Sequence, residues 1–191
     1  IIADDVNELD IIKFRNFYGK FANSQLSLTV LPNFNCNFAC PYCYEGKTQA
    51  KSNMGTMDDD VKEAIYKQVK ISAEARRNIG LAWYGGEPTL SKDIIMEMSK
   101  KIIDICKKYN VVYTSSMTSN GYLFDNSFVK AMNNLQIKSV QITIDGPPEV
   151  HNKFRKLKNG METFDKIIEN IKKIKSHGIK VNIRVNITKG D

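Results

Sequence analysis

Apolar residues recur along the chain as short runs, separated by longer segments in which they follow a helical period. The runs are rich in β-branched residues and are typical of buried strands. They lie at residues 25–32, 79–83, 111–116, 140–144 and 181–187. Five strands alternating with helices predict an α/β fold with a parallel sheet, because parallel neighbours need a long connection that a helix fills.

The segments between the strands carry helix start signals and apolar stripes. Helices are expected to begin near Thr56, at Ser91, at Asp125 and near Met161, and Gly178 stands where a C-terminal cap belongs. The residues expected on their buried faces are Val61, Ile65, Val69 and Ser72 in the first helix, Ile94, Ile95, Met98, Ile102, Ile105 and Cys106 in the second, Phe128 and Met132 in the third, and Phe164, Ile167, Ile168, Ile171 and Ile174 in the last.

Composition indicates a single globular domain with enough apolar material for a core, since 42% of the 191 residues are hydrophobic. No run of about 20 apolar residues predicts a membrane span. Lys and Arg number 28 against 21 Asp and Glu, a net charge of +7. This charge permits nucleic acid as a partner. However, the lysines of 100–108 and 166–175 alternate with isoleucine at helical spacing, as on a solvated helix face, which does not favour that partner.

Three of the four cysteines, Cys36, Cys40 and Cys43, lie within eight residues of one another. Clustered thiols more often hold metal than form disulfides, which indicates a reducing, cytoplasmic location. Thiolates select zinc, Cu(I) or iron-sulfur clusters. A structural zinc site needs a fourth ligand, whereas Cys106 lies on the apolar face of an expected helix, typical of a core residue. Three thiolates on a [4Fe-4S] cluster leave one iron open for a ligand that is not protein.

Other chemically distinctive residues lie at or near the C-terminal ends of the expected strands. They are the segments 85–88, 118–121, 145–146 and 184–186. The carboxyl ends of parallel strands meet at one edge of a sheet or one end of a barrel, which is where such folds bind ligands. We therefore expect these segments and the cysteine loop to form one site, in either a barrel or a doubly wound sheet.

These motifs resemble those of the radical S-adenosylmethionine (radical SAM) enzymes. The resemblance rests on Cys36-x3-Cys40-x2-Cys43 with Tyr42 before the last cysteine, on the Gly-Gly-Glu-Pro of 85–88, on the Thr-Ser-Asn-Gly of 118–121 and on the Ile-Asp-Gly-Pro of 144–147. It extends over about residues 26 to 187. It is greatest to the branch that modifies peptides and proteins, including peptide maturases and anaerobic sulfatase maturases. Members of that branch usually carry a C-terminal SPASM domain with auxiliary clusters.

The resemblance implies a set of ligands. Cys36, Cys40 and Cys43 would bind three irons of a [4Fe-4S] cluster, and the amino and carboxylate groups of SAM would chelate the fourth. Reductive cleavage of SAM would then give a 5′-deoxyadenosyl radical that abstracts hydrogen from the substrate. Glu87 would accept a hydrogen bond from the SAM ammonium group. Asp145 is expected to be a strand-end turn residue, with a role toward the substrate as the alternative. The residues implied in SAM binding are Tyr42, Gly85, Gly86, Glu87, Ser119, Asn120, Arg155, Arg184 and Asn186.

The resemblance also implies a fold and partners. We expect a partial parallel (β/α) barrel with five strand-helix units and the sixth missing. Residues 25–191 would form a C-terminally truncated core, and residues 1–24 would cover an edge or belong to a preceding domain. The expected partners are a peptide or protein substrate, an electron donor such as flavodoxin or ferredoxin, and the missing C-terminal domain. The alternatives are an anaerobic sulfatase maturase, a tRNA-modifying radical SAM enzyme, and a non-catalytic zinc or iron-sulfur module completed by Cys106 or a histidine.

Overall fold

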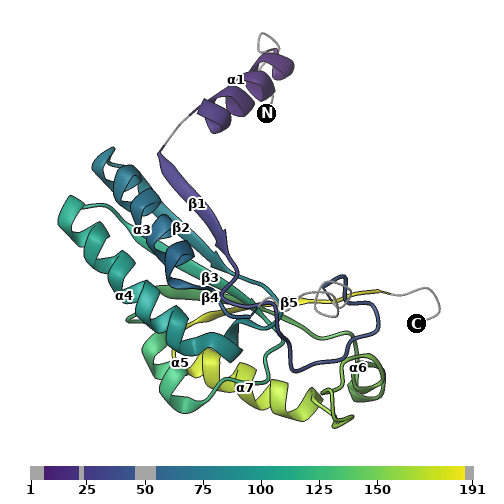
Figure 1. Cartoon of the computed structure of the whole chain (residues 1–191). Helices are drawn as coiled ribbons and strands as arrows, with labels where there is room; N and C mark the ends of the chain where they lie inside the picture. The colour runs from purple at the N-terminus through teal and green to yellow at the C-terminus, as the bar shows by residue number, and fades with distance from the viewer. Residues whose placement is uncertain (1–6, 22–23, 46–54, 188–191) are drawn as a thin grey trace.

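The computed structural model describes residues 7–21, 24–45 and 55–187. Five strands form one parallel sheet in the order β1-β2-β3-β4-β5, and the sheet does not close on itself (Figure 1). This confirms the predicted partial parallel barrel. The strands are β1 (Gln25–Val30), β2 (Asn78–Trp83), β3 (Tyr113–Ser119), β4 (Ile137–Thr143) and β5 (Lys180–Arg184).

Four helices cover one face of this sheet (Figure 1). They are α3 (Asp59–Glu74), α4 (Lys92–Tyr109), α5 (Asn126–Met132) and α7 (Phe164–Ser176). A 3₁₀ turn, η1 (Pro88–Ser91), joins β2 to α4, and the short α6 (Pro148–Phe154) lies beyond the carboxyl end of β4. The opposite face carries small and polar residues around a surface depression of about 530 Å³, including Ser27, Gly80, Thr114 and Ser116. No helix of the described residues is long and apolar enough to cross a bilayer.

The start of α3 differs from its prediction. The helix begins after Asp58, whose carboxylate accepts a hydrogen bond from Val61 N at 2.9 Å, so Thr56 lies outside it. Ser91 precedes α4 as predicted, but its hydroxyl does not cap the helix. It instead accepts a hydrogen bond from Asn33 Nδ2 at 2.9 Å. The cap is therefore replaced by a contact with the segment that leads to the cysteines.

The predicted core is largely confirmed. Ile95, Met98, Ile102, Phe128 and Met132 are fully buried between the helices and the sheet, and Cys106 is buried with them on α4. Burial raises the pKa of the Cys106 thiol to about 11. The prediction for Val61 was wrong, because its side chain is 45% exposed and Tyr66 instead turns inward.

Strand and helix ends shifted by a few residues from their predictions. β3 begins at Tyr113 because Val112 is exposed, and β5 ends at Arg184, leaving Val185 and Ile187 exposed beyond it. α7 begins at Phe164 rather than near Met161, and its C-terminal turn ends as expected with Gly178 in the left-handed region, at φ +75°.

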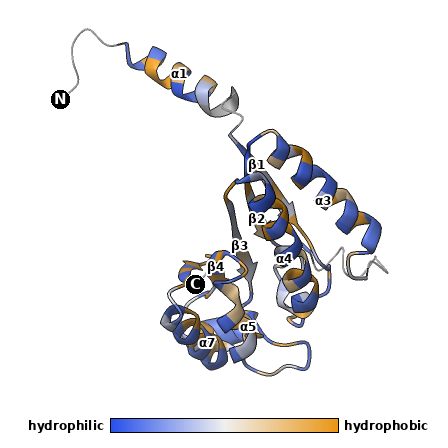
Figure 2. Cartoon of the chain, turned by 90° about the vertical axis from the view of Figure 1, so that its left-hand side faces the viewer, coloured by the Kyte–Doolittle hydropathy of each residue, from blue (hydrophilic) through white to orange (hydrophobic). Residues whose placement is uncertain are grey.

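Two helices were not predicted. α6 begins at Pro148, directly after Pro147, and spans only two turns, too short for a periodic signal. α1 (Glu8–Phe21) lies beyond the amino end of β1 and stands clear of the sheet in both views (Figures 1 and 2). Its apolar side chains Leu9, Phe14 and Tyr18 are exposed. The division of the chain at residue 24 stays a prediction.

Candidate functional site

A cavity of about 210 Å³ opens at the carboxyl end of the sheet, between the cysteine loop (residues 31–45) and the ends of β2, β3, β4 and β5. This is the end at which the sequence placed the site. Every predicted site residue except Glu87 lines the cavity: Cys36, Cys40, Tyr42, Cys43, Gly85, Gly86, Ser119, Asn120, Arg155, Arg184 and Asn186.

The glycine pair after β2 fixes one side of the cysteine loop. Gly86 N donates to Asn33 O at 3.3 Å, and Glu87 N donates to Asn35 O at 2.7 Å. A Cβ atom on Gly86 would lie 2.3 Å from the Asn35 oxygen, and one on Gly85 would lie 2.4 Å from the Asn33 oxygen. The glycines are therefore required because backbone passes against backbone just before Cys36.

The segment after α6 holds the other side of the loop. Ala39 N donates to Lys156 O at 3.0 Å, Lys158 N donates to Asn37 O at 2.9 Å, and Phe38 forms an antiparallel bridge with Leu157. The Phe38 ring is buried, with the Arg155 guanidinium carbon 5.5 Å from its centroid. The loop is thus held between two segments that are far from it in the sequence.

The three thiols of the loop share this cavity in a partly apolar setting. Burial raises the pKa of Cys36, and it raises that of Cys40 to about 11 against the opposing effect of Arg155. Cys36 Sγ accepts from Phe38 N at 3.4 Å and from Asn120 Nδ2 at 3.8 Å. In the described ranges no three His, Cys, Asp or Glu side chains converge on one point to hold a single ion. A cluster instead spreads its thiolates over separate irons.

Glu87 lies behind the cavity wall, fully buried. Its carboxylate accepts hydrogen bonds from Thr89 N at 3.0 Å, Ser119 Oγ at 2.8 Å and Asn120 N at 2.7 Å, and also from the Thr89 hydroxyl. Burial raises its pKa, while these hydrogen bonds act in the opposite direction. The structure therefore shows Glu87 joining η1 to the end of β3, and its contact with the SAM ammonium group stays a prediction.

A hydrogen-bonded network closes the cavity beside Tyr42. Its hydroxyl donates to Asp145 and accepts from Arg155 Nη1 at 2.8 Å, and the Asp145 carboxylate also accepts from Asn186 N at 3.1 Å. Burial and the bond to Asp145 raise the pKa of Tyr42 to about 12. Arg155 is 7% exposed, and its Nε has no partner among the described residues. A buried guanidinium with an unused donor is suited to an anionic group in the cavity.

Several contacts of the site were not predicted from the sequence. Asn33 is buried and donates to Glu87 O at 3.1 Å. The hydroxyls of Tyr44 and Tyr84 lie 2.6 Å apart at the cavity wall. His151 is fully buried, with Nε2 3.1 Å from Thr163 Oγ1, and burial lowers its pKa to about 4. Single polar residues at these positions give no pattern in the sequence, because their role arises only from distant contacts.

Comparisons with known proteins agree with this geometry. Residues 30–191 match the family model of the radical SAM superfamily. The chain is 33% identical over 171 residues to the cysteine-type anaerobic sulfatase-maturating enzyme of Clostridium perfringens, covering 85% of this chain and 44% of that protein. The chain therefore spans less than half of this relative's length.

Solved structures are also similar to this chain. Native anSMEcpe with bound AdoMet superposes with a TM-score of 0.69 at 33% identity, over 82% of this chain and 42% of that one. The same protein with AdoMet and the Cp18Cys peptide gives 0.67 at 32% identity, over 83% and 42%. A [4Fe-4S] cluster and SAM are the cofactors of this enzyme family. From the cavity, the cysteine triad and the family match together, we conclude that the chain belongs to the radical SAM superfamily.

Proposed function

We propose that this chain is the catalytic core of a radical SAM maturase, which cleaves SAM reductively and removes hydrogen from a peptide or protein substrate. The observation that supports this most is the shared cavity. The three cysteines of the loop and the residues implied in SAM binding, apart from Glu87, come from five separate chain segments, and they line one space. An accidental cysteine cluster would not bring these segments together.

The residues present fit the two cofactors. Three partly buried thiols on one loop suit a cluster with one open iron, and backbone and amide donors beside Cys36 are the type of contact that tunes its potential. When bound, the cluster and SAM supply a 5′-deoxyadenosyl radical at the cost of one electron. In this proposal Cys36, Cys40 and Cys43 hold the cluster.

The remaining side chains bind, orient and exclude water. Arg155 presents a buried cationic donor that suits the SAM carboxylate, and Ser119 and Asn120 lie across the cavity, held in place by Glu87. Tyr42 and Phe38 cover the loop side of the cavity with aromatic rings. In this proposal Arg184 and Asn186 complete the wall toward the SAM ribose. Excluding water matters because the radical must meet only the intended C–H bond.

The peptide or protein substrate is supported by the family branch. The relative with 33% identity is a sulfatase-maturating enzyme, and its structure has been solved with a peptide bound. Anaerobic sulfatase maturation is therefore the second candidate function, within the same reaction class. A one-electron carrier such as flavodoxin or ferredoxin belongs to the proposal because the cleavage of SAM consumes an electron.

Anaerobic reconstitution with iron and sulfide tests the cofactor assignment. We expect an absorption shoulder near roughly 400 nm and formation of 5′-deoxyadenosine with dithionite as the reductant. Both are lost in Cys36→Ala, Cys40→Ala or Cys43→Ala, whereas the matched control Cys106→Ala retains them. One tightly bound zinc and no iron chromophore would instead support the non-catalytic module.

The substrate class is tested separately by mass spectrometry. The reconstituted protein is incubated with SAM, dithionite and a synthetic sulfatase peptide that carries either cysteine or alanine at the residue to be modified. A mass change confined to the cysteine peptide supports sulfatase maturation. SAM cleavage without modification of that peptide would exclude it and leave the more general peptide maturase.

A further inference from the structure

Three lysines lie beside the cysteine loop on a surface that the cavity does not use. Lys153, Lys156 and Lys158 are exposed at the end of α6 and in the turn that follows. None of them forms an ion pair with an acidic side chain in the described part of the chain. Their charges are therefore available to a partner rather than neutralised within the protein.

The lysine-bearing segment is in direct contact with the cluster-binding loop. It pairs with the backbone of residues 37–39 through the two hydrogen bonds and the bridge described above. Neighbouring extended backbones lie about 5 Å apart, so a single backbone layer separates this segment from the loop that carries Cys40. Ala39, which directly precedes Cys40, is itself exposed. A protein bound here would approach the cluster closely without entering the cavity.

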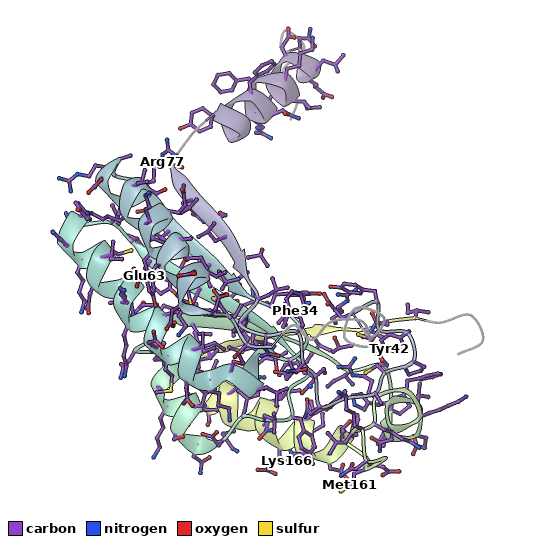
Figure 3. All side chains as sticks on the ribbon, viewed as in Figure 1. Phe34, Tyr42, Glu63, Arg77, Met161 and Lys166 are labelled. Carbon is purple, nitrogen blue, oxygen red and sulfur yellow. The ribbon has the colours of Figure 1, made fainter. Side chains whose placement is uncertain are left out.

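Apolar groups lie among these lysines. Met161 is 53% exposed, and its carbonyl accepts from Leu157 N at 3.0 Å. Lys153 Nζ lies 5.2 Å from the centroid of the half-buried Phe154 ring. Met161 and Tyr42 lie at the same end of the molecule, and Glu63 and Arg77 lie toward the other end (Figure 3). Apolar contact area with an excess of positive charge around it is typical of a surface that a negatively charged partner binds.

Lys153 and Lys156 also line a surface depression of about 510 Å³ that contains Glu149 and Glu162. Glu162 accepts a hydrogen bond from Asn152 Nδ2 at 3.2 Å and is thereby held toward α6. Lys158 is not among the residues that line the depression. The depression itself therefore holds two lysines and two carboxylates, and the excess of positive charge comes from Lys158 beside it. The net charge of the whole chain, +7, adds long-range attraction for an anionic protein.

We propose that this lysine surface, formed by Ala39, Lys153, Lys156, Lys158 and Met161, is the docking site of an acidic one-electron carrier protein. The proposal rests on the proposed function, because it needs a cluster in the loop. One electron passes from the carrier to the cluster, so the carrier is oxidised by one electron and the cluster is reduced by one electron. Surface charges of this kind mainly set the association rate and its salt dependence.

The test measures binding first, without turnover. Oxidised flavodoxin, an acidic one-electron carrier, is titrated against the reconstituted protein by stopped-flow fluorescence at several salt concentrations. We expect the triple variant Lys153→Glu, Lys156→Glu, Lys158→Glu to slow association about tenfold or more at low salt and to flatten its salt dependence. The milder Lys→Gln triple should give an intermediate effect and guards against a folding defect. Lys67, Lys100 and Lys107 are exposed on α3 and α4, and their charge reversal is the matched control.

SAM cleavage then separates this inference from the proposed function. With reduced flavodoxin the lysine-surface variant should form 5′-deoxyadenosine more slowly, and with dithionite it should match the unmodified protein. Equal slowing by the two triple variants, or no change in flavodoxin association, would overturn the docking site. If the cluster-loaded protein cleaves no SAM with dithionite, the proposed function fails, and the binding measurement still decides the docking site.

Discussion

Glu87 allows the clearest quantitative prediction, because its carboxylate is fully buried and accepts four hydrogen bonds. In Glu87→Ala the hydroxyls of Thr89 and Ser119 can turn to other acceptors, but the backbone N–H groups of Thr89 and Asn120 are fixed. Leaving a buried donor unpaired costs about 1–3 kcal/mol, so the two together cost about 2–6 kcal/mol. That is a large part of a typical unfolding free energy of about 5–15 kcal/mol.

The assay is urea unfolding of the protein without cofactors, followed by circular dichroism at 222 nm, with Glu97→Ala as the matched control. Glu97 is an exposed glutamate whose carboxylate lies 3.2 Å from Lys62 Nζ, so its removal should cost no more than about 1 kcal/mol. A loss below about 1 kcal/mol for Glu87→Ala would refute the reasoning. If Glu87→Gln, which keeps one acceptor, retains the fold and the cluster but binds SAM weakly, the predicted contact with the ammonium group gains support.

Three further predictions concern neighbouring positions. Gly86→Ala places a Cβ 2.3 Å from the Asn35 carbonyl oxygen, so the iron content of the reconstituted protein should fall. Gly55→Ala is the control, because no heavy atom lies within 4 Å of its added Cβ, and it should leave the iron content unchanged. Tyr42→Phe removes the hydroxyl that is hydrogen-bonded to the Asp145 carboxylate and to the Arg155 guanidinium. The variant should bind SAM more weakly by about 1–3 kcal/mol in calorimetry, and an unchanged affinity would contradict this. The pKa of His151 falls from 6.5 to about 4 on folding. Between pH 4 and pH 6.5 the unfolded chain therefore binds a proton at His151 that the folded chain does not bind. The unfolding free energy should therefore drop by about 3 kcal/mol as the pH falls from 6.5 to 4, and a His151→Gln variant with the same pH dependence would contradict the assignment.

Much of the fold follows from local sequence patterns. The five apolar runs became the five strands of the sheet, because β-branched residues buried on one or both faces give a signal that needs no knowledge of the partner strand. The ends were less accurate. Val112 and Val185 look like strand residues, yet both are exposed, since their burial depends on what packs above them. The helix α6 was not predicted because two turns are too short to show a helical period of apolar residues.

The predicted site residues that line the cavity could be found for a different reason. Cysteine spacing, a glycine pair and polar residues at the carboxyl ends of parallel strands are local features, and the topology alone brings them to one end of the sheet. Their interactions were not predictable. Gly86 was implied in SAM binding, whereas what the structure shows is that the absence of a side chain there makes room for the backbone of Asn35.

By itself, then, the sequence determined the alternation of strands and helices, the cysteine triad and the end of the sheet where the site forms. Only the tertiary structure decided that Glu87 is enclosed by donors from η1 and β3, that Asp145 joins Tyr42 to Asn186, and that a lysine-bearing segment pairs with the cysteine loop. The physical reason is the sequence separation over which each kind of signal acts. Periodicity and spacing act over a few residues, whereas these contacts join positions that are separated by dozens of residues and become neighbours only when the sheet has formed.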